Sequence, residues 1–109
     1  MGKYERAAQF WAVLVLAAHH RQIVTYVMMY KATGVASYGQ KDILSLIVSY
    51  CDSHNLPKLT TILVSEINGL PQDGKDDPGT VCTKQAQVFN FDWLDQKAPL
   101  PEDFKSVSS

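Results

Sequence analysis

The segment between Gln22 and Gly74 constrains the fold more than any other part of this 109-residue chain. Two helical patterns follow each other there, a short one at Thr25–Gly34 and a longer one at Gln40–Asn55. A β-branched, apolar run at Thr60–Ser65 is typical of a strand, and Asn68-Gly69 is typical of a tight turn after it. Helix, turn, helix, strand and turn is the order of a winged helix, so the segment predicts that scaffold.

Length and composition predict a single globular domain. Hydrophobic residues make up 46% of the chain and charged residues 19%, a balance that supports a core without metal or disulfide. We expect an α+β fold dominated by helices, with a winged-helix-like core of three helices and a short β-element. That core takes up residues 1–94. Residues 95–109, with Pro99, Pro101 and a serine-rich end, are expected to form an extended C-terminal arm.

Helix boundaries are marked by residues suited to capping. Thr25 is a good N-cap, because its hydroxyl accepts a hydrogen bond from a free backbone N–H of the next turn. Gly34 suits the left-handed conformation that ends a helix running from Tyr26 to Thr33. Pro57 cannot continue the following helix, which is therefore expected to end around Asn55.

The first expected helix, from about Tyr4 to Arg21, is apolar around nearly its whole circumference. Two interpretations follow: it is the central helix of the fold, or it forms the core of a homodimer. Its most apolar stretch, Ala7–Ala18, is too short to span a bilayer, which needs about 20 residues. We expect no membrane partner and a cytoplasmic protein.

Charge is divided unevenly along the chain. Residues 1–58 carry six Lys or Arg against three acids, a balance of +3, whereas residues 59–109 carry four lysines against eight acids, a balance of −4. The overall charge of −1 argues against a strongly basic nucleic-acid binder. The division predicts two faces of opposite potential, or else a solvated surface with chance clustering.

Four short motifs carry a resemblance to a known family: Val24-Thr25-Tyr26, Gly34, Leu56-Pro57 and Ile62-Leu63-Val64. Together they resemble the DNA-binding half of the alkylguanine-DNA alkyltransferase and alkyltransferase-like families. In those families a T-Y-x-x-[LMI]-A-x-x-x-G helix precedes a recognition helix, a strand and a turn. The likeness covers about half of the chain and implies a winged-helix scaffold that holds DNA.

The chemistry of those families is missing. Their Pro-Cys-His-Arg element would fall near Leu59–Ile62, where this chain has Leu-Thr-Thr-Ile. Without the thiol there is no acceptor for an alkyl group, and without the histidine there is no base to activate one. The chain is also similar to small uncharacterised bacterial and phage proteins that pair a Gly-Leu-Pro turn, here Gly69-Leu70-Pro71, with a late Phe-Asp-Trp, here Phe91-Asp92-Trp93.

The sequence offers no other catalytic or metal-binding motif. Cys51 and His54 lie one helical turn apart, but a zinc site needs about four converging ligands. We interpret Cys51 as a core cysteine and His54 as a residue at a helix end, favoured by the helix dipole. The expected protein is not an enzyme and uses no metal or cofactor.

A DNA-binding role depends on the helix expected to begin near Gln40. The side chains expected to reach phosphates and base edges are Gln40, Lys41, Ser45 and Ser49, flanked by phosphate contacts from Arg21, Lys31 and Lys58. Asp42 and Asp52 on the same helix oppose a polyanion, as do the acids of the Gln72–Gly79 loop. Binding to double-stranded DNA is therefore expected to be weak and to be lost steeply with salt.

The competing hypothesis is a protein-interaction module, of the kind that a phage or mobile element encodes, that binds or inhibits a larger complex. Its docking residues would be Phe10 and Trp11 of the first helix, or Phe91 and Trp93 among the acids of the C-terminal arm. Exposed aromatic residues between acids make good anchors for a basic groove. The other interpretation of the arm is that its aromatic residues, Phe104 included, fold over the core.

Overall fold

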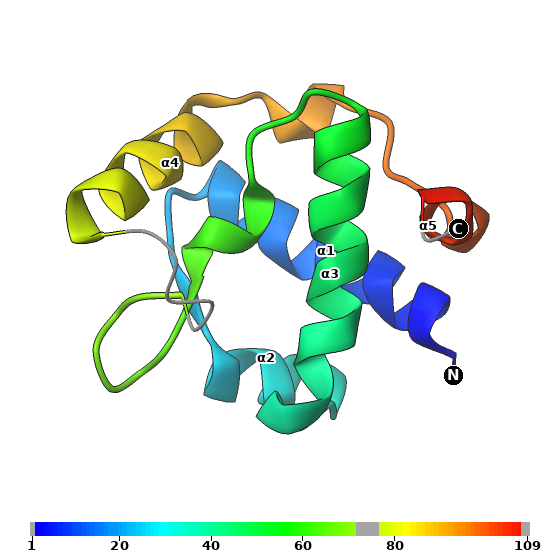
Figure 1. Ribbon diagram of the computed structural model, residues 1–109, viewed down its shortest axis with the longest axis horizontal. Helices are drawn as coiled ribbons and strands as arrows, with labels where there is room; N and C mark the ends of the chain where they lie inside the picture. The colour runs from blue at the N-terminus through cyan, green and yellow to red at the C-terminus, as the bar shows by residue number, and fades with distance from the viewer. Residues whose placement is uncertain (1, 72–76, 108–109) are drawn as a thin grey trace.

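The computed structural model describes residues 2–71 and 77–107 and shows a helix-dominated α+β fold, as the sequence predicts (Figure 1). In chain order the elements are α1 (Lys3–His19), β1 (Val24–Thr25), α2 (Tyr26–Thr33), α3 (Ser37–Ser53), the 3-10 helix η1 (Leu59–Ile62), β2 (Leu63–Val64), α4 (Pro78–Asn90), the 3-10 helix η2 (Trp93–Asp95) and α5 (Pro101–Val107). None of the helices in this described part of the chain combines the length and apolarity that a bilayer span requires.

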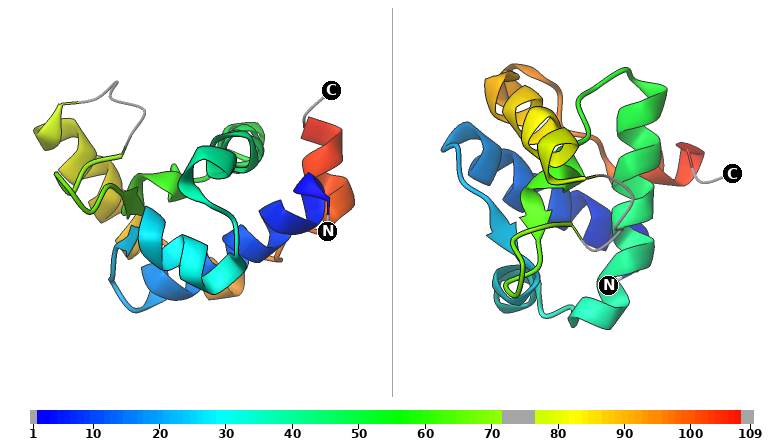
Figure 2. Two further views of the ribbon diagram at one scale, coloured as in Figure 1. Left: turned by 90° about the horizontal axis from the view of Figure 1, so that it is seen from below. Right: turned by 60° about the vertical axis from the view of Figure 1, so that its left-hand side comes forward.

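Helix α1 lies at the centre of the fold. It passes behind α3, and α5 lies beside its N-terminal half (Figures 1 and 2). Phe10 and Leu14 are fully buried, and the Trp11 ring meets Tyr50 of α3 edge-on, with 5.3 Å between ring centroids. Burial within one chain therefore explains most of the apolar circumference of α1, as the central-helix interpretation expects, whereas Leu16 stays 57% exposed.

Helix α2 has the boundaries and caps that the sequence predicts. The Thr25 hydroxyl accepts a hydrogen bond from the Met28 N–H at 3.1 Å. Gly34, with φ of 80°, donates its N–H to the Tyr30 carbonyl and ends the helix. The Arg6 guanidinium of α1 donates to the Thr33 carbonyl, so α1 also holds the end of α2.

Helix α3 begins at Ser37, three residues before the expected start at Gln40. Its buried face carries Ile43, Leu46, Ile47, Tyr50 and Cys51, as the helical spacing predicts. The helix ends with Asn55 in the left-handed conformation, at a φ of 54°. The Leu56 and Asn55 N–H groups then bond the carbonyls of Cys51 and Asp52, a Schellman arrangement.

The expected six-residue strand at Thr60–Ser65 is wrong over most of its length. Leu59–Ile62 forms the 3-10 helix η1, and only Leu63–Val64 pairs as a strand, in parallel with Val24–Thr25. Strand β1 is short because Thr25 already caps α2, so the residues after Thr25 are helical and cannot pair with β2. The Asn68-Gly69 turn is confirmed, with Gly69 at φ of 71°, but no β-hairpin follows among the described residues.

The C-terminal arm is not an extended tail. Pro101–Val107 forms helix α5, whose fully buried Phe104 packs against α1 and α3. The Leu100 N–H donates to the Asp103 carboxylate at 2.8 Å, which fixes the start of α5. The prediction of an extended arm from residue 95 is therefore wrong, because the arm supplies a core residue, whereas the interpretation of an arm folded over the core is confirmed.

Candidate nucleic-acid interface

The polar side of α3 faces away from the core. Lys41, Ser45 and Ser49 recur at every fourth residue, and this spacing places them on one side of a helix. Lys41 and Ser45 are exposed and Ser49 is half-buried. Because α5 packs on the Tyr50 side of α3 through Phe104, it leaves the Lys41–Ser49 side open.

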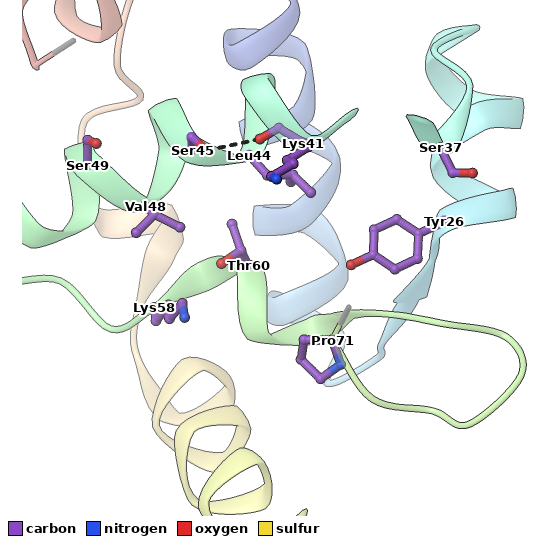
Figure 3. Close-up of a pocket in the computed structure, with 10 residues that line it drawn as sticks. All are labelled: Tyr26, Ser37, Lys41, Leu44, Ser45, Val48, Ser49, Lys58, Thr60 and Pro71. Atoms are coloured by element: carbon purple, nitrogen blue, oxygen red, sulfur yellow. Dashed lines mark hydrogen bonds between the residues drawn. The ribbon is translucent and has the colours of Figure 1, made fainter. Parts of the chain in front are cut away.

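A groove runs beside this side of α3 (Figure 3). Its volume is about 650 Å³, and it is lined by Tyr26, Ser37, Lys41, Leu44, Ser45, Val48, Ser49, Lys58, Thr60 and Pro71. We call it the α3 groove. The residues come from α2, α3, the residues around η1 and the turn after β2, so segments far apart in the sequence form its walls. Within the groove the Ser45 hydroxyl donates to the Lys41 carbonyl at 3.1 Å, which orders this turn of α3.

The electrostatic character of the groove is set by two lysines. Lys41 belongs to α3 and Lys58 lies just before η1, and none of the lining residues within 2–71 and 77–107 is acidic. Hydroxyl groups of serine, threonine and tyrosine make up most of the remaining polar lining. Asp42 and Asp52 are exposed on α3 but are not part of the lining. Ammonium groups beside hydroxyl donors suit an anionic oxygen ligand, such as a phosphate diester.

Gln40 does not belong to this surface, so its expected role in DNA contact is wrong. The residue is fully buried, and its side-chain nitrogen donates to the carbonyls of Tyr26 at 3.2 Å and Val35 at 2.9 Å. These bonds tie α3 to α2 and to the turn between them. The helical period explains the burial, because Gln40 lies three residues before Ile43 and seven before Ile47, on the same inner face of α3.

Two of the flanking cations lie elsewhere. Arg21 follows α1 and donates to the side-chain oxygen of Asn90 at 2.9 Å, and Lys31 is exposed near the end of α2. Neither lines the α3 groove, whereas Lys58 does. The structure therefore brings together four of the seven expected residues: Lys41, Ser45, Ser49 and Lys58.

The turn after β2 contains the predicted Asn68-Gly69 pair. The Ser65 N–H bonds the Leu70 carbonyl at 2.9 Å, and the Gly69 N–H bonds the Ser65 carbonyl at 2.8 Å, so the loop is closed at its base. Ile67, 90% exposed, stands out from this loop. Of the acidic loop expected at Gln72–Gly79, residues 72–76 lie outside the described part of the chain, while Asp77 caps α4 by accepting the Thr80 N–H at 2.7 Å.

The aromatic residues expected to dock a protein partner are mostly core residues. Phe10, Trp11 and Trp93 are buried, and the Trp93 indole N–H donates to the Val88 carbonyl at 2.8 Å. Phe91 is half-buried, 4.6 Å from Trp93 between ring centroids. Docking through Phe10, Trp11 or Trp93 is therefore wrong for the folded chain, because each of these rings is already covered by its own core.

The two cysteines are free and differ in environment. Cys51 is buried, and burial raises the pKa of its thiol to about 11, whereas Cys82 is exposed on α4. Asp77, at the start of α4, has a pKa lowered by the backbone N–H bond from Thr80. Among residues 2–71 and 77–107, no three His, Cys, Asp or Glu side chains gather as metal ligands would. The thiol of Cys51 is thus held in its unreactive, protonated form at neutral pH.

Comparison with protein-family models, with curated proteins and with solved structures finds no match.

Proposed function

We propose that this protein is a non-enzymatic DNA-binding protein that contacts the duplex through the open side of α3. The observation that carries the proposal is the placement of Lys41, Ser45 and Ser49 on an uncovered helix face, with Lys58 across the same groove. We assign the winged-helix-like role to α2, the turn at Gly34 and α3, with α3 as the recognition helix.

The N-terminal half of α3 is the part best suited to enter a groove of DNA. Tyr38 is 93% exposed there, and Lys41 follows within one turn. The positive end of the helix dipole adds to the charge of Lys41 at the same end. Residues 6–41 contain no Asp or Glu, and Asp42, the first acid of α3, is exposed beside Lys41 but outside the groove lining.

The small number of cations supports a weak binder. Lys41 and Lys58 give two phosphate contacts from the groove, and each such contact contributes about one to the slope of log affinity against log salt concentration. Two phosphate contacts fit weak binding to DNA of any sequence at low salt better than high-affinity recognition of an operator. A weak, salt-sensitive affinity for DNA suits a protein that regulates another DNA-bound factor.

The test is fluorescence anisotropy of a labelled random-sequence duplex, two helical turns long, titrated with protein at low salt. Lys41→Glu is expected to weaken binding by about tenfold. Lys97→Glu is the matched control, because Lys97 is exposed outside the groove and the same charge is reversed. Equal losses in the two variants, or no binding by the wild type, would overturn the proposal.

A further inference from the structure

A second hollow lies on another part of the surface, between the C-terminal half of α1 and α2. We call it the α1–α2 groove. Its volume is about 300 Å³, and its lining is Val13, Leu16, Ala17, His20, Gln22, Ile23, Val24, Met28 and Ala32. Seven of these nine side chains are apolar, and none of the nine lines the α3 groove.

The walls of the α1–α2 groove expose large apolar side chains. Leu16 is 57% exposed, Met28 50% and Ile23 44%, and Val27 beside Met28 is exposed as well. The core does not use these groups, since α1 and α2 bury their opposite faces through Leu14, Val15 and Met29. An apolar patch gathered around a hollow, with a polar rim, is typical of a surface that a protein partner covers.

The charged residues that lie next to the lining in the chain, Lys31 and Arg21, are both basic. Lys31 lies one turn of α2 beyond Met28, and Arg21 lies between the lining residues His20 and Gln22. No Asp or Glu occurs anywhere from residue 6 to residue 41, which covers every residue of the lining. Lys31 and Arg21 are therefore the charged residues next to the lining in the chain, and Glu5, the one acid of α1, lies at the other end of that helix. The ligand complementary to this positive charge is apolar with acidic flanks.

The charge argues against a second copy of this chain in symmetric contact. A two-fold dimer through this face would place one Lys31-bearing rim against another, and like charges brought together across an interface cost affinity. We propose that the α1–α2 groove binds an amphipathic helical segment of another protein, with apolar anchors on one side and Asp or Glu beside them. Leucine or methionine anchors fit Leu16, Ile23 and Met28, while acids on the segment face Lys31 and Arg21.

The experiment is selection of helical peptides from a random phage-displayed library on the wild-type protein, with counter-selection on Met28→Glu. Individual enriched peptides are then synthesised and titrated by fluorescence anisotropy. Met28 is half exposed, so its replacement leaves the core intact, and circular dichroism checks the fold. The matched control is Leu94→Glu, since Leu94 is 58% exposed on η2, outside the groove.

The expected result is enrichment of amphipathic peptides with acidic flanks. Their affinity falls by about tenfold or more in Met28→Glu, falls by about threefold in Lys31→Glu and is unchanged in Leu94→Glu. Three results would overturn the proposal: no enrichment that depends on Met28, enriched peptides with basic flanks, or a wild-type dimer in light scattering that Met28→Glu dissociates. Peptide binding by Lys41→Glu at wild-type affinity is also expected, so this surface and the α3 groove are tested separately.

Discussion

The ring of Phe104 lies 5.5 Å from the ring of Tyr50, measured between centroids, on the inner side of α3. Phe104 also lies 6.3 Å from Trp11, so one side chain of α5 joins the two longest helices. This contact determines which side of α3 is available, because α5 covers the Tyr50 side and leaves Lys41 in solvent. The C-terminal helix is part of the core and indirectly defines the candidate interface.

Replacement of Phe104 by alanine is expected to lower the free energy of unfolding by about 3–5 kcal/mol, because it leaves a cavity between α1, α3 and α5. Urea denaturation followed by tryptophan fluorescence measures the change, since Trp11 lies beside the cavity. Leu100→Ala, just before α5 and half exposed, is the control and is expected to change stability by less than about 0.5 kcal/mol. A loss in Phe104→Ala as small as that expected for the control would contradict the packing of α5 into the core.

Thr25→Ala is expected to cost about 1 kcal/mol, because the Met28 N–H loses the hydroxyl that caps α2. Thr25→Ser keeps the hydroxyl and is expected to retain most of the stability. Thermal denaturation of the two variants makes the comparison. A serine variant as unstable as the alanine variant would assign the effect to the lost methyl group instead of the cap.

Gln40→Ala is expected to lower stability by about 1–3 kcal/mol, since the Tyr26 and Val35 carbonyls lose their shared donor. DNA affinity of the folded variant is expected to stay at the wild-type level, because the side chain is buried. Ser45→Ala is expected to do the opposite. Its stability should be unchanged, but its DNA affinity should be lower, because the Ser45 hydroxyl lies in the α3 groove. A Gln40→Ala protein that is stable but fails to bind would restore the direct contact that the sequence predicted.

The two thiols are expected to react very differently with iodoacetamide. At mildly alkaline pH the native protein should take up one label, at the exposed Cys82, and a second label at Cys51 only after unfolding. Mass spectrometry after digestion locates the label. Rapid native modification of Cys51 would contradict its burial.

The same thiol gives stability a dependence on alkaline pH. The pKa of Cys51 is raised in the folded state to about 11 from a usual value of 9.0, so its contribution is fully present below pH 9 and is lost as pH rises toward 11. Burial raises the pKa of Tyr50 as well, which acts in the same direction. Urea midpoints between these pH values should fall less steeply in Cys51→Ala than in the wild type, and parallel falls would count against this linkage.

The sequence predicted the elements that depend on local signals. Thr25 and Gly34 mark the ends of α2 because a hydroxyl and a missing Cβ act within one turn of the chain. The start of α3 was missed because Ser37-Tyr38-Gly39 has the composition of a turn. Two helix starts carry local signals, Asp77-Pro78 for α4 and Pro101-Glu102-Asp103 for α5, and the second lies within the segment that was expected to be an extended arm.

The extent of the strands and the full lining of the α3 groove depend on contacts between segments that are distant in the sequence. The Thr60–Ser65 run has strand propensity, but a strand needs a partner, and β1 offers only two residues before α2 begins. In the candidate site, Lys41, Ser45 and Ser49 followed from helical period alone. Tyr26, Thr60 and Pro71 also line the α3 groove, because folding brings their segments next to α3. No spacing in the sequence indicates that these segments lie together.

The most direct test of the central claim is amide NMR of the labelled protein during titration with a random-sequence duplex at low salt. The account predicts shift changes concentrated at Lys41, Ser45, Ser49 and Lys58, which disappear as salt is added. An unchanged spectrum at saturating duplex would contradict it, as would changes confined to Leu16, Ile23 and Met28 of the α1–α2 groove.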